Sequence, residues 1–460
     1  MRFVQTPLSW RPAWLKKRET RSAASRGNIK ALDGVRAIAA LLVVSLHLNK
    51  GSGVPWDFNS EPLSTSFAVF GRTGVVLFFI LSGFLLFRPY VQALLFQDEW
   101  PSIRTFYIRR IFRIWPAYYF TLFTMIILFQ HQYLQPEHWK ELALFLTFFM
   151  DSSIKTWQQL NGPFWTLAIE WQFYMVLPWL ALGFAWIVRR VSSTPQQRLK
   201  ATFACCGGLI VWGLAIRLFG HYYQVNPNLT ILVPRPVLNF FLFFTYGIQG
   251  KYLEVFALGM IASTCYVYAH HPEFGPAFKE RLERLSYWAW GLGILILACM
   301  SPWQAESTTA MNGVFSTVHS FPFLDQFQFQ YMVFGDPITA AGYSLCMLAI
   351  LFGPPALRWV FETRFLYLIG MVSFSLYMWH LKMLGIFQVS VLPYVPHLAR
   401  RISYWLWVFL VIVPFCYVLY IFIERPGMRV GTLLTPRKST EPQSFSAKLK
   451  TIFAISSSPR

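Results

Sequence analysis

The stretch Ala31–Leu48, with the sequence ALDGVRAIAALLVVSLHL, is an apolar segment with an acid and an arginine near its start and a histidine near its end. Its length and composition predict a helix that crosses a membrane. Arg36 and His47 are eleven positions apart, which on a helix places them ~20° apart in azimuth and ~16 Å apart along the axis. Asp33 lies within ~40° of that face. The segment therefore predicts one polar stripe on an otherwise apolar helix.

Similar apolar runs recur along the whole chain. Of the 460 residues, 55% are hydrophobic and 13% are charged, and average soluble domains have about twice that charged fraction. The runs predict an all-α fold, a polytopic transmembrane helical bundle of about ten spans with both termini cytosolic. The spans are expected at residues 32–49, 69–87, 111–130, 164–188, 202–219, 252–269, 287–300, 338–353, 366–388 and 402–423. The run 138–150 is expected to be interfacial or re-entrant, and the apolar piece 237–249 has no assigned place.

The formal net charge of +20 is concentrated toward the two ends of the chain. Eight Lys and Arg residues lie in 1–30, and seven lie in 425–460. The positive-inside rule explains this distribution, so no nucleic-acid partner is predicted. We expect basic cytosolic tails at 1–30 and 430–460, the second one disordered, around a membrane domain at 31–429. The six cysteines show no metal-ligand spacing, so no metal site is predicted.

His47 is the first candidate for a catalytic residue. Ionisable side chains inside a span cost ~3 kcal/mol or more, so those that occur are functional candidates. A neutral imidazole can take a proton from a hydroxyl near neutral pH, which makes His47 a candidate general base. A histidine satisfied by its own helix is the structural alternative. Arg36, with Asp33 one turn before it, is expected to be an anchored cation that orients an anionic group.

A basic run in FYIRRIFRIWPAYY places Arg109, Arg110 and Arg113 at the cytosolic end of the third span. Planar guanidinium groups suit the binding of phosphates. Arg109 and Arg113 also share a helix face, because they are four residues apart. Topology signalling and contact with lipid headgroups are the structural alternatives.

Glu170 is the only acid in the span 164–188. A buried unpaired carboxylate is costly, so we expect Glu170 to be hydrogen-bonded, protonated or facing a cavity. Other candidates for lining a cavity are Ser82, Trp165, Tyr174, Tyr377 and His380. For Ser82 the alternative is close helix packing at Ser82-Gly83, and for His380 it is a structural place at a helix end.

Six segments resemble, in the same order, segments of the integral-membrane acyltransferase-3 family, whose bacterial members O-acylate surface polysaccharides, glycolipids and some secondary metabolites. The segments are ALDGVRAIAALLVVSLH, GVVLFFILSGFLL, RRIFRIWPAYY, FWTLAIEWQFYMVLP, VSFSLYMWH and IERPG. Each one alone is a weak signal, but the ordered set is specific and covers the chain from Ala31 to Arg429. Ala37 stands where the family commonly has Gly.

The resemblance implies a membrane acyltransferase that moves an acyl group, acetyl by default, from cytosolic acyl-CoA to a hydroxyl of a sugar, glycolipid or similar acceptor. It implies that His47 deprotonates the acceptor and that Glu170 lines the cavity. The donor would be held by Asp33, Arg36, Arg109, Arg110 and Arg113. Acyl-CoA is then a substrate, no bound cofactor is expected, and the protein would lie in the lipid bilayer of a bacterial inner membrane as a multi-pass protein.

Two other classes of protein fit the same polar residues. A proton-coupled transporter or flippase of a lipid-linked sugar or acyl group would use the intramembrane His, Arg and Glu as a proton relay. The sequence shows no internal repeat of the kind common in such transporters. A scaffolding membrane subunit is the third class, and it predicts that His47 can be replaced without effect.

Overall fold

The computed structural model describes residues 29–51, 70–191, 193–226, 233–309, 327–396 and 399–435. Helices dominate these ranges, and no strand occurs within them. The prediction of an all-α fold is therefore confirmed. The predicted tails fall largely outside the described residues, and helix α17 (Arg425–Leu434) runs across the boundary placed at residue 430.

Eight helices are long and apolar enough to cross a membrane, judged by length and composition. Seven are α2 (Lys30–Gly51), α4 (Gly74–Phe96), α5 (Ile103–Phe129), α7 (Phe164–Val191), α8 (Pro195–Val225), α11 (Pro276–Thr309) and α12 (Phe327–Phe352). The eighth, here called the C-terminal helix, joins α15 (Arg400–Trp407), α16 (Val413–Leu419) and α17 through π-helical turns at Val408–Ile412 and Tyr420–Glu424. This is the architecture of a multi-pass helical membrane protein.

The two remaining predicted spans coincide with α10 (Leu253–Ala269) and α14 (Arg364–Ser390). Helix α10 has only 17 residues, so the count of ten spans stays a prediction. The runs 138–150 and 237–249 form the short helices α6 (Trp139–Leu146) and α9 (Arg235–Thr245). At 1.5 Å per residue these helices are only ~12 and ~16 Å long, too short to cross a ~30 Å hydrocarbon core. The four-residue α13 (Pro355–Arg358) connects α12 to α14.

Several helices are longer than the apolar runs that predicted them, and α4 and α5 show why. Helix α4 continues past Arg88 and Pro89 to Phe96. Helix α5 begins at Ile103, where the Ser102 side chain accepts a hydrogen bond from the Thr105 backbone N–H. Hydropathy marks the apolar length of a segment, whereas backbone hydrogen bonding carries the helix into its polar flanks. The basic residues expected at the end of the third span therefore lie within α5.

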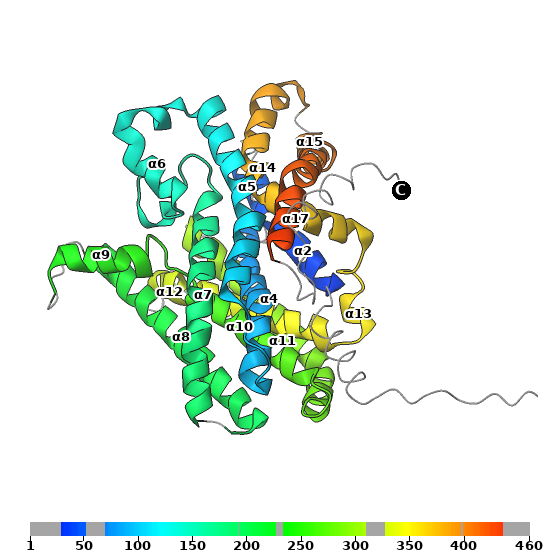
Figure 1. Ribbon diagram of the computed structural model, residues 1–460. Coiled ribbons are helices and arrows are strands. Elements are labelled where there is room, and N and C mark those ends of the chain that lie inside the picture. The colour runs from blue at the N-terminus through cyan, green and yellow to red at the C-terminus, as the bar shows by residue number, and fades with distance from the viewer. Residues whose placement is uncertain are drawn as a thin grey trace, which may run out of the picture.

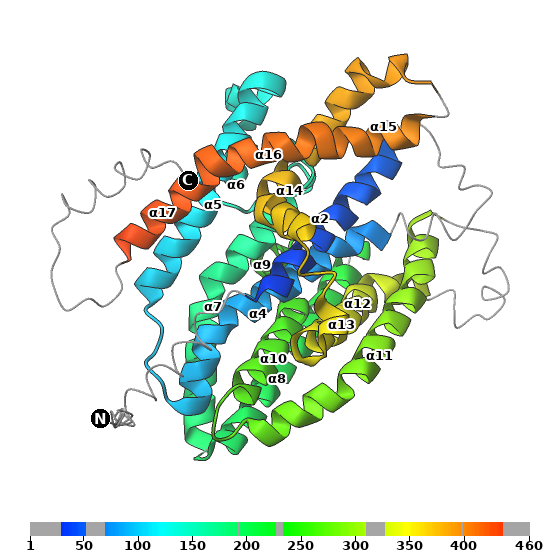
Figure 2. The ribbon, with the colours of Figure 1, turned by 90° about the vertical axis from the view of Figure 1, so that its right-hand side faces the viewer.

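Helix α2 lies at the centre of the bundle and packs against both α14 and α4 (Figure 2). Helix α10 packs against α4 and α8, while α11 and α12 form a pair beside them. Helices α5 and α7 run side by side, and α17 packs along α5 (Figure 1). The polar stripe of α2 thus faces neighbouring helices inside the bundle.

Glycines allow α4 and α10 to approach closely. A Cβ atom at Gly83 would lie 2.2 Å from the Phe256 carbonyl oxygen, and one at Gly259 would lie 2.1 Å from the Ile80 carbonyl oxygen. Neither distance is compatible with a side chain. The packing role considered for Ser82-Gly83 is therefore confirmed at Gly83.

Candidate active site

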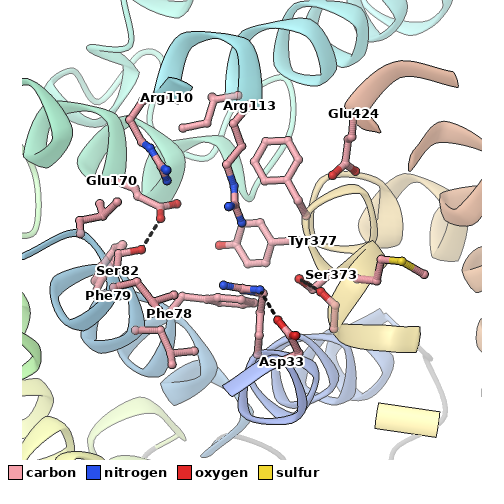
Figure 3. A pocket seen from close by; sticks show the side chains of 18 of the residues that line it. Asp33, Phe78, Phe79, Ser82, Arg110, Arg113, Glu170, Ser373, Tyr377 and Glu424 are labelled. Atoms are coloured by element: carbon pink, nitrogen blue, oxygen red, sulfur yellow. Dashed lines mark hydrogen bonds and ion pairs between the residues drawn. The ribbon is translucent and has the colours of Figure 1, made fainter. Parts of the chain in front are cut away.

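A cavity of about 500 Å³ lies between α2, α4, α5, α7, α14 and the C-terminal helix (Figure 3). This volume falls within the range of small-molecule sites. Eight of the side chains singled out from the sequence line it: Asp33, Arg36, Ser82, Arg110, Arg113, Glu170, Tyr174 and Tyr377. Residues from five different helices that were chosen separately thus meet around one space.

Three arginines reach the cavity, Arg36 from α2 and Arg110 and Arg113 from α5. Arg36 forms an ion pair with Asp33 at 3.0 Å. Figure 3 shows Arg110 and Arg113 extending from α5 into the cavity. Within the described residues the buried Nε of Arg110 makes no hydrogen bond. A buried donor without a partner costs about 1–3 kcal/mol, so a ligand that accepts a hydrogen bond there would be stabilised.

Glu170 faces the cavity and is hydrogen-bonded, in agreement with two of the three states expected for it. The hydroxyl groups of Ser82 and Tyr174 both donate to its Oε1 atom. The first comes from α4 and the second from the next turn of α7, so the carboxylate is held between two helices. The Arg110 guanidinium lies 6.0 Å from the centre of the Tyr174 ring, which places a cation close to this acidic group.

The structure adds Glu424 to the site, a residue that the sequence analysis did not single out. Glu424 is buried at the end of the second π-helical turn and lines the cavity. Its Oε1 accepts a hydrogen bond from the Ser375 hydroxyl of α14. The signal was present in the segment IERPG, where an acid follows directly on a long apolar run.

Tyr377 of α14 forms part of the cavity wall. Its hydroxyl lies 2.6 Å from the Thr166 hydroxyl of α7. The Phe78 ring packs edge-on against the Tyr377 ring with centroids 5.7 Å apart. All three residues line the cavity, so two aromatic rings and a hydroxyl pair form its wall on this side.

Beyond this wall lies a pair of histidines, His47 of α2 and His380 of α14. His380 Nε2 is 3.1 Å from His47 Nδ1, and the ring centroids are 4.9 Å apart. His380 is fully buried, and its ring centroid is 6.0 Å from that of Tyr377. Neither histidine is among the residues that line the cavity in the described part of the chain. The site therefore has an arginine-lined cavity and an adjacent histidine pair.

Two candidates from the sequence point elsewhere. Arg109 donates from Nε to the Thr435 hydroxyl at 3.0 Å, on the side of α5 that packs against α17. Trp165 packs against Trp157 and Tyr252, with both pairs of ring centroids 6.1 Å apart. The two arginines that α5 contributes to the cavity are thus Arg110 and Arg113, three residues apart, and Arg109 does not line it.

A second buried polar cluster was also missed by the sequence analysis. Arg217 of α8 binds Glu254 of α10 through Nε at 2.9 Å, and it binds Asp336 of α12 through a terminal nitrogen at 3.3 Å. Arg72 also contacts Asp336, at 3.5 Å. The rule that selected His47 and Glu170 applies equally to Arg217 and Glu254, which lie inside predicted spans. Their mutual pairing makes this cluster a connection between helices.

Comparison with known proteins identifies the family of the chain. The model of the acyltransferase-3 family, described as an acyltransferase domain, matches residues 29–421. The matched range includes all of the residues that line the cavity except Glu424 and Met428. The chain therefore belongs to the acyltransferase-3 family.

Named relatives share parts of the sequence. The chain is 30% identical to peptidoglycan O-acetyltransferase OatA of Listeria monocytogenes over 185 residues, which are 36% of this chain and 26% of that protein. It is 24% identical over 446 residues to a provisionally named O-acetyltransferase of Staphylococcus aureus strain COL, covering 90% of this chain and 60% of the relative. The chain thus spans less than two thirds of the length of these relatives. No solved structure matches it significantly.

Proposed function

We propose that the chain is a membrane O-acyltransferase that moves an acyl group, acetyl by default, from cytosolic acyl-CoA to a hydroxyl of a carbohydrate acceptor in the cell membrane or envelope. The family match and the names of the relatives support the reaction class. The peptidoglycan in the name of the Listeria relative makes a cell-wall glycan the first acceptor to test.

The observation that carries the proposal is the arginine-lined cavity. Arg110 keeps a buried donor without a hydrogen-bond partner in the described part of the chain, and Arg113 extends beside it. Guanidinium groups bind phosphate oxygens with two parallel hydrogen bonds. The phosphates of acyl-CoA are ligands of this kind, and we place them at Arg110 and Arg113 with Arg36 deeper along the path.

His47 is the general base of the proposed reaction. It lies eleven residues beyond Arg36, which is ~16 Å farther along α2. A long, narrow donor that enters past the arginines would present its thioester on the Tyr377 side of the cavity. His47 would take the proton of the acceptor hydroxyl, whose oxygen then attacks the thioester carbonyl. Glu170, held by Ser82 and Tyr174, would orient the substrates from α7.

The test is release of free CoA by the purified wild-type protein and by His47→Ala, each supplied with acetyl-CoA and a cell-wall glycan extract. We expect release with wild type, loss of at least ~100-fold with His47→Ala, and an acetyl ester on the glycan by mass spectrometry. Equal folding of the two proteins is checked by thermal unfolding. Absence of release with acetyl and longer-chain donors would contradict the proposal and favour a transporter or flippase, which proteoliposome uptake would then test.

A further inference from the structure

We infer that His380 is a positioning residue that acts with the Val43 carbonyl oxygen to fix the tautomer of His47, so that His47 Nε2 is the atom that accepts the proton. This inference rests on the proposed function, because it assigns an atom to the general base. It comes from the donor and acceptor geometry of the histidine pair, not from the cavity.

The first step concerns His380. Its Nδ1 lies 2.8 Å from the Tyr377 carbonyl oxygen and 3.1 Å from the Leu376 carbonyl oxygen. Carbonyl oxygens only accept hydrogen bonds, so Nδ1 carries the hydrogen and donates it. In the neutral ring Nε2 then has a lone pair and acts as an acceptor. The backbone of α14 therefore sets the tautomer of His380.

The second step concerns the tautomer of His47. Its Nδ1 lies 2.8 Å from the Val43 carbonyl oxygen and 3.1 Å from His380 Nε2. Both neighbours are acceptors, so His47 Nδ1 carries the hydrogen and shares it between them. In a neutral His47 the lone pair is therefore on Nε2. Each contact of the pair has one donor and one acceptor in this assignment.

The neutral state of His380 follows from its surroundings. Its side chain is fully buried, and its two ring nitrogens face carbonyl groups and a second imidazole. A positive charge on this ring would be desolvated and would face another group that becomes cationic during the reaction. A neutral acceptor can stabilise the His47 cation without placing a second charge beside it.

The assignment gives the atoms of the proton transfer. The O–H bond of the acceptor breaks and a bond to His47 Nε2 forms, while His47 Nδ1–H keeps its hydrogen bond to His380 Nε2. The acceptor oxygen forms the ester bond, the carbon–sulfur bond of the thioester breaks, and the thiol leaves with the proton returned by His47. In Ser-His-Asp enzymes a carboxylate holds the histidine in the same way. Here a neutral imidazole does so and avoids burying a charge.

The experiment compares three substitutions of His380 that separate its two contacts. His380→Gln places an amide oxygen near the position of Nε2 and keeps an acceptor for His47. His380→Asn keeps an amide at the position of Nδ1 but cannot reach His47. His380→Leu removes both contacts. His270→Gln is the matched control, because His270 has the same Nδ1 contact to a backbone carbonyl, at 2.8 Å from Tyr266 O, but lies at the end of α10.

For His380→Asn and His380→Leu we expect kcat to fall roughly 100-fold, with the KM for acetyl-CoA within about 2-fold of wild type. His380→Gln should stay within about 10-fold of the wild-type kcat, and His270→Gln should not change it. A wild-type kcat in His380→Asn, or an equal fall of kcat in His380→Gln and His380→Asn, would overturn the inference. If His380→Leu fails to fold, the comparison of His380→Gln with His380→Asn decides.

A second measurement reads the tautomer without catalysis. In protein labelled with ¹⁵N-histidine, the ring signals of His47 are assigned by their absence from His47→Ala. We expect the Nδ1–H tautomer in wild type and in His380→Gln. In His380→Asn the contact to Val43 O remains but the acceptor at position 380 is lost, so the share of the Nδ1–H tautomer should fall. An Nε2–H tautomer in wild type would overturn the inference even if the protein releases CoA. The Nδ1–H tautomer in a protein that releases no CoA would contradict only the proposed function.

Discussion

The hydroxyl groups of Tyr377 and Thr166 lie 2.6 Å apart and join α14 to α7 in the wall of the arginine-lined cavity. His380 follows Tyr377 by three residues on α14, so it lies almost one turn farther along the same helix. The Tyr377 ring thus separates the space proposed for the donor from the pair proposed for proton transfer. A thioester can reach His47 only if this wall moves or if the donor is narrow enough to pass it.

The first prediction concerns this wall. Tyr377→Ala removes the ring, and we expect water to reach the thioester, because closed active sites protect reactive groups by excluding water. Hydrolysis of acetyl-CoA without acceptor should rise, and transfer to the glycan should fall. The ratio of free acetate to glycan ester measures both effects.

Tyr377→Phe is the matched variant, because it keeps the ring and removes only the hydroxyl. It should hydrolyse acetyl-CoA at a rate close to that of wild type. A wild-type ratio of acetate to ester in Tyr377→Ala would show that the ring does not separate the two parts of the site.

The second prediction concerns the donor-binding arginines. Arg110→Gln and Arg113→Gln each remove a charged hydrogen-bond donor, which is worth about 1.5–3 kcal/mol. The KM for acetyl-CoA should therefore rise by roughly 10- to 100-fold, with a smaller change in kcat. Steady-state CoA release at varied donor concentration measures both constants.

Arg190→Gln is the control for the loss of an arginine. Its guanidinium stacks on Trp186 at 3.9 Å, ~30 Å along α7 from Glu170. Arg109→Gln tests the geometry further, because the Arg109 side chain binds Thr435 and does not line the cavity. A larger rise in KM for Arg109→Gln than for Arg110→Gln would contradict this arrangement.

The sequence predicted the fold class and most of the cavity for a simple physical reason. Apolar length marks membrane helices, and an ionisable side chain within such a length is too costly to occur by chance. That argument selected Arg36, His47 and Glu170. It was not applied to Arg217 and Glu254, although they satisfy it equally well.

Other features depend on contacts between distant segments and could not be derived from spacing alone. Helical periodicity paired Arg109 with Arg113, but the direction of each side chain depends on where α17 packs along α5. The partnership of His47 with His380 joins residues 333 positions apart. Nothing local to either residue indicates that contact. Only the packing of α2 against α14 determines it.

The third prediction concerns the Arg217 cluster. The side chains of Arg217 and Glu254 are 4% and 2% exposed, so Arg217→Leu would leave Glu254 buried without its cation. Breaking a buried pair in this way costs about 3–5 kcal/mol. We expect a large drop in the thermal unfolding midpoint of the purified protein, measured without substrates.

The exposed pair of Arg284 and Glu280 provides the comparison, because their side chains are 74% and 61% exposed. Arg284→Leu should change the free energy of unfolding by less than about 1 kcal/mol. Replacing Arg217 by Met and Glu254 by Leu together should recover part of the loss of the single variant. Equal destabilisation by Arg217→Leu and Arg284→Leu would show that the buried cluster does not hold α8 and α10 together.

The fourth prediction concerns the contact of α4 with α10. A Cβ atom at Gly259 would meet the Ile80 carbonyl oxygen at 2.1 Å, so Gly259→Ala must push the helices apart. Overpacking of this kind costs about 1–3 kcal/mol. At Gly207 of α8 no atom lies within 4 Å of the added Cβ, and there Ala should stabilise the helix by about 0.5–1 kcal/mol. The midpoints of thermal unfolding of the two variants should therefore shift in opposite directions.

The same two variants should differ in activity. Because α4 also carries Ser82, Gly259→Ala should disturb the hydrogen bond from Ser82 to Glu170 and lower CoA release. Gly207→Ala should leave CoA release unchanged. A Gly259→Ala protein as stable and active as wild type would show that the two helices do not approach as closely as described.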